Sequence, residues 1–286
     1  MSNTIASRVY RDKFRKSTLD VLLRKALVSE AICEVDRSDS KRIQSPYGST
    51  PTATVQAIAG TYSVAAYTNT DDTLTVTDEV IVAEHIFDFE EVLTSFDIFA
   101  SRVDQQAFEI ANKIDTFVLN NVLEDATGTY TTPAGGFLTA ANIPVIFSNI
   151  ISKVAGYSEA YKGLFIVLEN TDIVGVIQSQ AASGYSYADS ALKNGFMDSY
   201  MGVDIYVTRT GTFADATLGT TTYTNSGHRL AGVKKVATYA SPRGVRFEEK
   251  AVSGKTGMEV VTYGYVGSKV WAPKASLLID ITILVS

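Results

Sequence analysis

No proline or glycine interrupts the stretch from Thr94 to Asp125, TSFDIFASRVDQQAFEIANKIDTFVLNNVLED. Its apolar residues recur three and four positions apart, the spacing that places side chains on one face of a helix. Thr94 and Asp97 have the spacing of a capping box, and Gly128 lies just past the end, where a left-handed residue often closes a helix. At 1.5 Å per residue this helix would be about 45 Å long. A compact chain of this size has a radius of gyration of about 19 Å, so we predict either a core helix that spans the molecule or the spine of an elongated subunit.

The composition is that of an ordinary globular protein, with 45% apolar and 20% charged residues among 286. The net charge of −6 argues against a dedicated nucleic-acid-binding protein. The charge is uneven, however, because residues 1–25 carry seven basic residues against two acidic ones, a net charge of +5, and the remainder therefore carries −11. Residues 6–32 have the apolar spacing of an amphipathic helix. We favour a solvated basic face for this helix, and contact with a neighbouring subunit or a polyanion is the alternative.

Residues 40–88 have a different character. Their first half is rich in proline, glycine and threonine, and their second half alternates between apolar and polar residues, as in Leu74 and Val76 between threonines. The turn residues Asn69–Asp72 separate two such alternating runs, which predicts a β-hairpin. A two-stranded hairpin alone is only marginally stable in water. This one carries Thr and Ser on much of both faces, so it must lie against the body of this chain or against another copy.

The remainder of the chain predicts a mixture of helices and strands. Residues 142–157 and 171–183 read as helices, residues 164–168 as a buried strand, and residues 203–208 as a further strand. The stretch HRLAGVKKVATYA, residues 228–240, is expected to form one strand. The last 42 residues alternate in the pattern of several strands and end in a buried one from Ala275 to Val285.

The sequence offers little for catalysis or metal binding. Its two histidines, His85 and His228, have no Cys or His at ligand spacing, and no nucleophile elbow, P-loop or dinucleotide-binding motif is present. Cys33 has acidic neighbours that disfavour a thiolate. The acidic pair Asp71 and Asp72 is expected to serve a turn and not a metal site. We therefore predict no catalytic, cofactor-binding or metal residues, and a hydrolase that uses Asp71, Asp72 and His85 is the enzyme alternative.

The sequence also bears on location. No apolar run approaches the roughly 20 residues of a membrane span, and no apolar segment follows the basic N-terminus as it would in a secretory signal. The single cysteine cannot form an internal disulfide. These features predict a protein made in a cytoplasm. They count against the alternative of a cell-surface β protein, which the Thr-rich loops would favour.

The order of these parts resembles that of the major capsid proteins of tailed bacteriophages. In both, a basic N-terminal arm is followed by a long polar hairpin, a spine-length helix, an α/β region and a β-rich end. The resemblance is most specific in HRLAGVKKVATYASPRGVRFEEKAVSGKTGMEVVTYGYVGSKVWAPKASLLI. There a small-residue strand, a charged strand, a Gly- and Tyr-bearing strand and a terminal strand after Pro273 follow one another. Nearly the whole chain is covered, although by the order of elements and not by a catalytic signature.

The resemblance implies an α+β protein with the Hong Kong 97-type capsid fold, which encapsulin shells share. Its parts would be an N-terminal arm (1–39), an extended β-hairpin loop (40–93), a peripheral domain (94–140 with 243–286, spine helix 94–126) and an α/β axial domain (141–242). The extended loop would reach over a neighbouring subunit. The residues expected at contacts between subunits are Arg8, Arg11, Lys13, Thr70, Asp71 and Asp72.

The resemblance also implies a function in assembly and not in catalysis. The chain would form pentamers and hexamers of an icosahedral virion shell, assembled in the host cytoplasm around packaged double-stranded DNA that it touches non-specifically. Its partners would be other copies of itself, a portal protein, and scaffold or decoration proteins, with no cofactor and no membrane. An encapsulin-like compartment or another virion protein, such as a tail tube, is the alternative.

Overall fold

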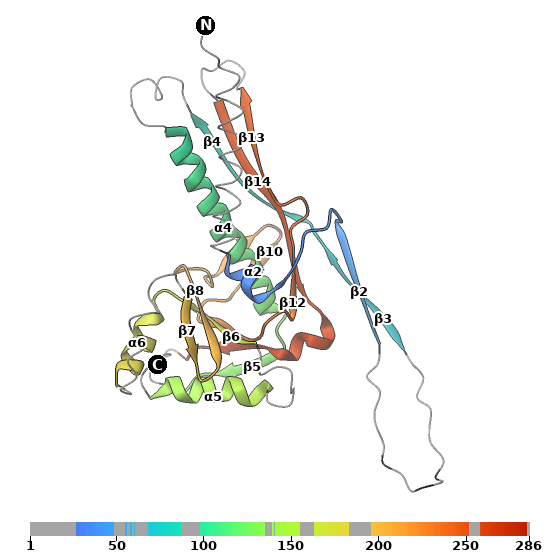
Figure 1. The fold of residues 1–286 in the computed structure, drawn as a ribbon, viewed down its shortest axis with the longest axis vertical. Helices are drawn as coiled ribbons and strands as arrows, with labels where there is room; N and C mark the ends of the chain where they lie inside the picture. Colours follow the sequence, from blue (N-terminus) through green and yellow to red (C-terminus); the bar gives the residue numbers. More distant parts are fainter. Residues whose placement is uncertain are drawn as a thin grey trace.

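The structure is a computed structural model that describes residues 27–48, 55, 58, 60, 68–86, 98–134, 139, 141–154, 163–182, 196–251 and 258–284. It is an elongated α+β molecule. A long helix lies along one side of a narrow sheet, and a second, wider sheet forms the base (Figure 1). The N-terminal contact candidates Arg8, Arg11 and Lys13 lie outside the described residues.

The long helix predicted by the sequence is present. Helix α4 spans Ile98–Glu124, which is 27 residues or about 40 Å. The first predicted turn, 94–97, lies outside the described residues. Residues at the predicted spacing are buried, with Ile110 and Val118 fully so. Their burial against the sheet, and not the caps alone, stabilises a helix of this length.

The narrow sheet lies along α4 and is centred on β14 (Met258–Val270). Strands β4 (Asp78–Ile86) and β13 (Val245–Ala251) pair with β14 on its two sides, both antiparallel. Nearer the base, β14 pairs with β12 (Ala237–Ala240), which pairs in parallel with the short β1 (Glu34–Asp36). The helix α2 (Val28–Ile32) precedes β1 and packs on α4. The main hydrophobic core fills the space between α4 and these strands.

The wide sheet has six strands in the order β5-β15-β11-β6-β8-β7. Their bounds are β5 Gly128–Thr131, β15 Leu278–Thr282, β11 His228–Val233, β6 Leu164–Glu169, β8 Val203–Thr208 and β7 Phe196–Tyr200. Every residue of β6 is buried, as expected for a central strand covered on both faces. Helices α5 (Asn142–Val154) and α6 (Ile173–Ala182) contribute Ile146, Phe147, Ile150 and Val176 to a second core.

Strands β5 and β15 come from the ranges 94–140 and 243–286, yet both belong to the wide sheet together with strands from 141–242. The two predicted domains therefore share a sheet, and the division between them stays a prediction. The short elements that complete the described fold are β9 (Ala216–Leu218), β10 (Thr221–Tyr223) and the 3-10 helix η2 (Ala272–Leu277).

The expectation of a single strand over residues 228–240 is wrong. The chain forms β11 in the wide sheet, turns at Lys234 and Lys235, and continues as β12 in the narrow sheet. Lys235 has a positive φ of 61°, which breaks the extended backbone. The apolar pattern continues across the break because both strands are buried, so the sequence pattern alone does not reveal the turn.

The extended hairpin is confirmed, but its turn is not where the sequence placed it. Strand β2 (Arg42–Gly48) pairs antiparallel with β3 (Asn69–Thr75), with Arg42 opposite Thr75 and Gly48 opposite Asn69. Residues 69–72 are therefore in a strand and not in a turn. Figure 1 shows β2 and β3 diverging from the narrow sheet at one side of the body. After β3 the chain continues into β4, so one extended stretch joins the hairpin to the narrow sheet.

Candidate functional site

The base of the hairpin is fastened to the body by ionic and hydrogen-bonded contacts. The carboxylate of Asp72 lies 2.5 Å from the ammonium of Lys269 on β14, and Lys269 Nζ also donates to the carbonyl of Thr73 at 3.0 Å. The backbone N–H of Ala272 donates to Asp72 at 3.4 Å. Burial raises the pKa of Asp72, but these donors lower it more, so the net pKa is below its usual value. The ionised pair therefore stabilises the attachment of β3.

A small core lies beneath this ion pair. Leu74 and Val76 from the hairpin side pack with Ala240 and Trp271 from the body, and all four are buried. Trp271 donates its indole N–H to Thr238 Oγ1 at 2.8 Å, so its polar atom is satisfied inside the cluster. This cluster is separate from the two larger cores. In the described residues, these contacts attach the base of the hairpin to the body.

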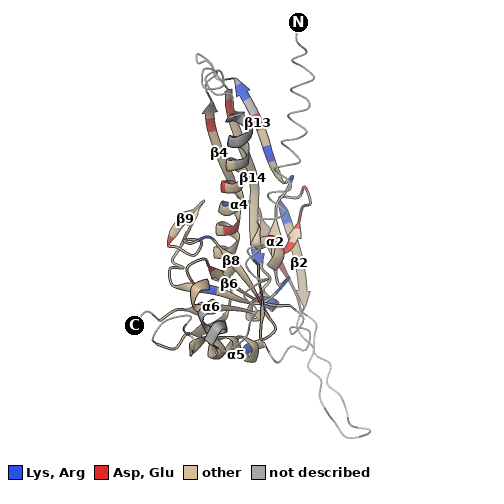
Figure 2. Cartoon of the chain, turned by 60° about the vertical axis from the view of Figure 1, so that its left-hand side comes forward, with Lys and Arg blue, Asp and Glu red and all other residues tan. Residues whose placement is uncertain are grey.

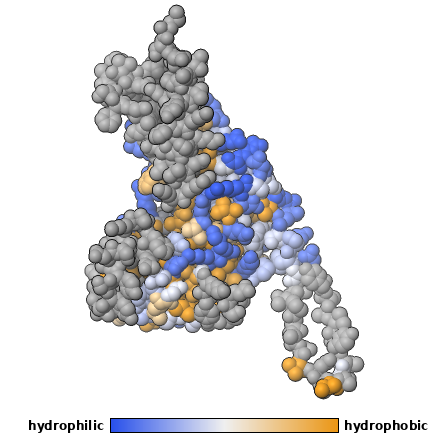
Figure 3. Space-filling model, in the orientation of Figure 1, coloured by the Kyte–Doolittle hydropathy of each residue, from blue (hydrophilic) through white to orange (hydrophobic). Residues whose placement is uncertain are grey.

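Beyond this attachment the described part of the hairpin is largely open to solvent. Thr70 and Asp71 are exposed on β3. Val55 and Ile58 are exposed completely, at 104% and 103% of their reference areas. Figure 3 shows hydrophobic atoms that lie away from the body. An apolar pair held so far from any core is a surface that another molecule is expected to cover.

The predicted contact residues on the hairpin differ in their environment. Thr70 and Asp71 are exposed and available, whereas Asp72 is engaged with Lys269 of the same chain. The sequence indicated neither this pairing nor the apolar tip. The alternation of Leu74 and Val76 was the one available signal that the base of the hairpin is buried.

Helix α4 acts as the scaffold to which the other segments are bonded, and it uses polar side chains on its buried face. Asn120 donates to the carbonyl of Thr212 at 2.7 Å, and its side-chain oxygen accepts from Asn225 at 2.8 Å. Asn121 donates to the carbonyl of Ser268 on β14 at 2.7 Å. Sequence reasoning assigned no role to these polar residues. Their positions among apolar neighbours on one helical face were the available signal.

Two further side chains extend this set along the helix. Gln106 accepts from the hydroxyl of Thr262 on β14 at 2.8 Å and donates to Glu84 on β4 at 3.1 Å. Asp125, just past the end of α4, accepts the backbone N–H of Val270 at 3.1 Å. The helix is thus bonded to the narrow sheet near both ends, which makes the two move as one unit. Figure 2 shows acidic residues along α4 and β4 and basic residues on β13.

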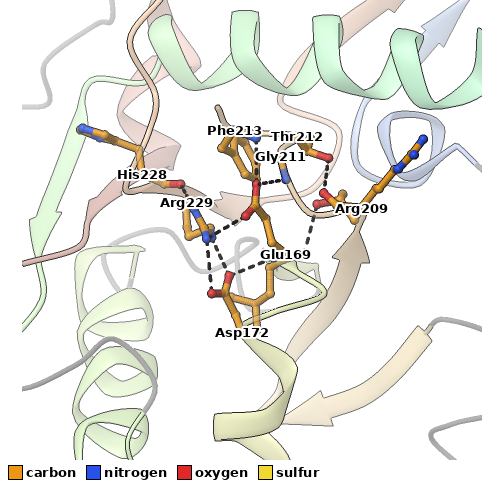
Figure 4. A network of polar contacts seen from close by, with 10 residues as sticks. Glu169, Asp172, Arg209, Gly211, Thr212, Phe213, His228 and Arg229 are labelled. Carbon is orange, nitrogen blue, oxygen red and sulfur yellow. Dashed lines mark hydrogen bonds and ion pairs between the residues drawn. The ribbon is translucent and has the colours of Figure 1, made fainter. Parts of the chain in front are cut away.

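A buried ionic network ties the loop after β8 to the wide sheet (Figure 4). Arg229 on β11 contacts Asp172 at 2.6 Å and Glu169 at 3.2 Å. Glu169 also accepts the backbone N–H groups of Gly211 and Phe213, at 3.1 and 3.0 Å. Each charge therefore has an opposite charge and further donors or acceptors, the condition for a buried ion pair to persist. The network fixes the loop in place, and all three charged groups are occupied by one another.

The groups of the enzyme alternative do not converge. Asp72 pairs with Lys269 on β14, whereas His85 lies opposite Glu259 on the same strand. Ten residues of an extended strand separate those two positions, which is about 33 Å. Burial raises the pKa of the Cys33 thiol to about 12, so it is not a nucleophile. Among the residues that the structure describes, no three His, Cys, Asp or Glu side chains gather to hold a metal ion.

The base of the molecule exposes apolar side chains as well. Val174 and Ile177 lie on the open face of α6, Val145 on α5 and Met201 at the turn between β7 and β8. Figure 3 shows hydrophobic patches among polar ones over this part of the body. None of the helices in the described ranges is both long and apolar enough to cross a membrane.

The sequence matches no protein-family model and no curated protein. Solved structures do match. The chain is similar to one from the capsid of the cyanophage P-SCSP1u, with a TM-score of 0.71 and 13% identity over 92% of this chain and 89% of that one. It is similar to one from the mature capsid of bacteriophage PhiM1, with a TM-score of 0.69 and 12% identity over 90% and 87% of the two chains.

A third match is to a virus-like particle from Pyrococcus furiosus, with a TM-score of 0.61 and 9% identity over 93% of this chain and 96% of that one. At such identities the likeness establishes the fold, and it does so over nine-tenths of the chain. The predicted Hong Kong 97-type capsid fold is therefore confirmed.

Proposed function

We propose that this chain, which has the fold of capsid subunits, is the major capsid protein of a tailed bacteriophage and assembles into the pentamers and hexamers of an icosahedral shell. The observation that carries the proposal is the near-complete coverage in both directions, 92% of this chain and 89% of the cyanophage capsid chain. A likeness over only part of the chain would leave room for an added domain with another function. The role is structural and not catalytic.

The shape suits repeated contacts between copies. Helix α4 and its sheet form a stiff body, since polar bonds join them near both ends. The base of the hairpin is anchored to that body by the Asp72–Lys269 pair and the small core around Trp271. In a shell, the hairpin of one copy would lie on the next, and Thr70, Asp71 and the apolar pair Val55 and Ile58 would meet that neighbour. Contacts of modest strength multiply when every copy makes them around a closed surface.

The remaining partners follow from charge and position. The acidic bulk of the chain would keep the shell from gripping packaged DNA tightly, and contact with DNA would be non-specific. Residues 1–25 carry a net charge of +5 and hold Arg8, Arg11 and Lys13. We propose that this arm contacts a neighbouring copy or a scaffold protein. A portal protein and decoration proteins complete the set of expected partners, and assembly would take place in the host cytoplasm.

The experiment that tests the proposal is negative-stain electron microscopy of the concentrated protein, with light scattering on the same sample. Closed particles, or rings with fivefold and sixfold symmetry, are the expected result. A monodisperse monomer or dimer that persists with candidate scaffold proteins present would contradict it. Tubes of stacked rings would point to the tail-tube alternative.

A variant of the hairpin tip tests the mechanism within the same assay. Burial of one Val or Ile side chain contributes about 1.5–3 kcal/mol, so the double change Val55→Glu and Ile58→Glu removes about 3–6 kcal/mol from every contact. We expect it to abolish particles while the circular dichroism spectrum and the monomer melting temperature stay unchanged. The matched control is Val55→Thr with Ile58→Thr, which keeps the β-branched shape and should weaken assembly by less. Normal assembly of the glutamate variant would refute a contact at the tip.

A shell that encloses protein cargo in place of a genome is the second candidate. The match to the virus-like particle of Pyrococcus furiosus is the observation in its favour. Particles isolated from cells of the natural host distinguish the two, because a phage shell contains nuclease-protected DNA and a cargo compartment contains a co-purifying protein.

A further inference from the structure

Residues 27–36 form a segment that packs on the body of the molecule. Leu27, Ile32 and Cys33 are buried in the main core. The segment then continues as β1, which adds in parallel to the edge of β12. In the sequence it directly follows the basic residues 1–25.

A single carboxylate, that of Asp115, accepts hydrogen bonds from the first turn of this segment. Asp115, in the middle of α4, accepts the backbone N–H of Val28 at 3.0 Å and that of Ser29 at 2.9 Å. It also accepts the hydroxyl of Ser29 at 2.6 Å. These contacts satisfy two of the backbone donors that the start of a helix leaves unpaired. Asp115 is 7% exposed and Ser29 is fully buried, so the contact is closed to water.

A lysine donates hydrogen bonds to the other end of the same helix, α2. Lys235, at the turn between the two sheets, donates its ammonium to the carbonyls of Glu30 and Cys33, at 3.0 and 2.6 Å. Its backbone N–H donates to the carbonyl of Ile32 at 2.6 Å. α2 is therefore held by an acid at its start and a base at its end, the arrangement that the helix dipole favours.

Four other ionisable groups lie close to Asp115 or to the helix that it holds: Glu30, Cys33, Lys235 and Tyr239. Glu30 on α2 forms a surface ion pair with Arg37 at 2.7 Å. Burial raises the pKa values of Cys33 and of Tyr239 on β12 to about 12, so both stay neutral. The hydrogen-bond partners of Asp115 are the backbone N–H groups of Val28 and Ser29 and the hydroxyl of Ser29, which are neutral groups.

We propose that Asp115 is a pH-sensitive latch, whose protonation controls how firmly residues 27–36 are held against α4. Burial raises the pKa of Asp115 to about 6, although the three donors from Val28 and Ser29 lower it in part. When the segment leaves, water reaches the carboxylate and its pKa returns toward 3.8.

The docked state therefore binds a proton that the released state gives up. Docking is tightest at acidic pH and weakens as the pH rises through about 6. The shift from 3.8 to about 6 limits the change in the docking equilibrium to roughly a hundredfold. The latch is a property of the single chain, so its test is independent of whether the chain assembles into a shell.

The test is hydrogen exchange of the full-length, unassembled protein between pH 5 and pH 8, with rates corrected for the intrinsic pH dependence measured on the unfolded chain. We expect protection of residues 27–36 to fall by about tenfold across this range, with the midpoint of the fall between pH 5 and pH 6. Peptides from β6 serve as the internal reference and should not change. Protection of residues 27–36 that stays constant over the range would overturn the proposal.

Two variants assign the effect to Asp115. Asp115→Asn cannot titrate and should remove the pH dependence. The control Asp125→Asn removes a different carboxylate, just past the end of α4, and should keep the pH dependence. If Asp115→Asn fails to fold, Ser29→Ala decides, because loss of the hydroxyl donor raises the pKa of Asp115 further and should move the midpoint to higher pH. A pH dependence that survives in Asp115→Asn, or a midpoint that Ser29→Ala leaves in place, refutes the latch.

Discussion

Replacement of Leu74 by alanine is expected to release the hairpin from the body without unfolding the rest of the chain. Leu74 is 4% exposed and belongs to the small cluster with Val76, Ala240 and Trp271. This cluster lies apart from the cores of the narrow and wide sheets. The expectation is therefore a local loss of stability, confined to β2 and β3.

The expected loss of stability in Leu74→Ala follows from the cavity that the change leaves in this small cluster. A buried Leu→Ala change costs about 2–5 kcal/mol, because the transfer energy of the lost atoms adds to that of the cavity. In a cluster of four buried residues, little else compensates for it. A two-stranded hairpin is marginally stable without packing, so the loss falls on the hairpin. At about 1.4 kcal/mol per factor of ten, backbone amides in β2 and β3 should exchange about 30 to 4,000 times faster.

Hydrogen exchange read by mass spectrometry separates this local effect from a global one. Peptides from β2 and β3 should lose protection in Leu74→Ala, whereas peptides from α4 and β6 should keep it. The matched control is Leu168→Ala, which removes the same atoms from a fully buried position in the wide sheet. That control should lower the melting temperature and raise exchange across the whole sheet.

Two results would refute the reasoning. Equal loss of protection in β6 and in the hairpin would show that the small cluster is part of the main core. Unchanged protection in β2 and β3 would show that the Asp72–Lys269 pair alone holds the hairpin. The first result would make the hairpin a rigid arm, and the second would make its attachment depend on salt.

Two further substitutions test the wide sheet. In Glu169→Gln the amide oxygen can still accept from the N–H groups of Gly211 and Phe213, but the amide NH2 then faces the guanidinium of Arg229 and leaves it partly uncompensated. We expect a loss of about 3–5 kcal/mol in the free energy of unfolding, measured by urea titration. A loss below about 1 kcal/mol would contradict a structural role for the network. Gly232→Ala places a Cβ against the backbone carbonyl of Leu277 and 2.9 Å from Leu278 Cα, so we expect a loss of at least about 3 kcal/mol. Its control is Gly202→Ala. Gly202 also has a positive φ, but no atom lies within 4 Å of the added Cβ, so the change should cost only about 1 kcal/mol. Equal melting temperatures for the two variants would show that the contact at Gly232 is unimportant.

The sequence determined those parts of the fold that depend on local pattern. The long helix was predictable because its apolar spacing is continuous and no residue interrupts it. The α+β class was implied by the resemblance of the order of elements to that of capsid proteins. The hairpin was predictable from its alternation, although its turn was placed wrongly, since Asn and Asp are common both in turns and on exposed edge strands.

Only the tertiary structure decided which distant residues meet. The sequence pattern does not show that Asp72 pairs with Lys269, or that Asp115 in the middle of a helix holds the start of α2. Local propensity acts over a few residues, whereas these contacts join positions 197 and 86 residues apart, which only the folded chain brings together. The break between β11 and β12 likewise depends on two sheets competing for one buried stretch, and that choice is made by packing and not by sequence pattern.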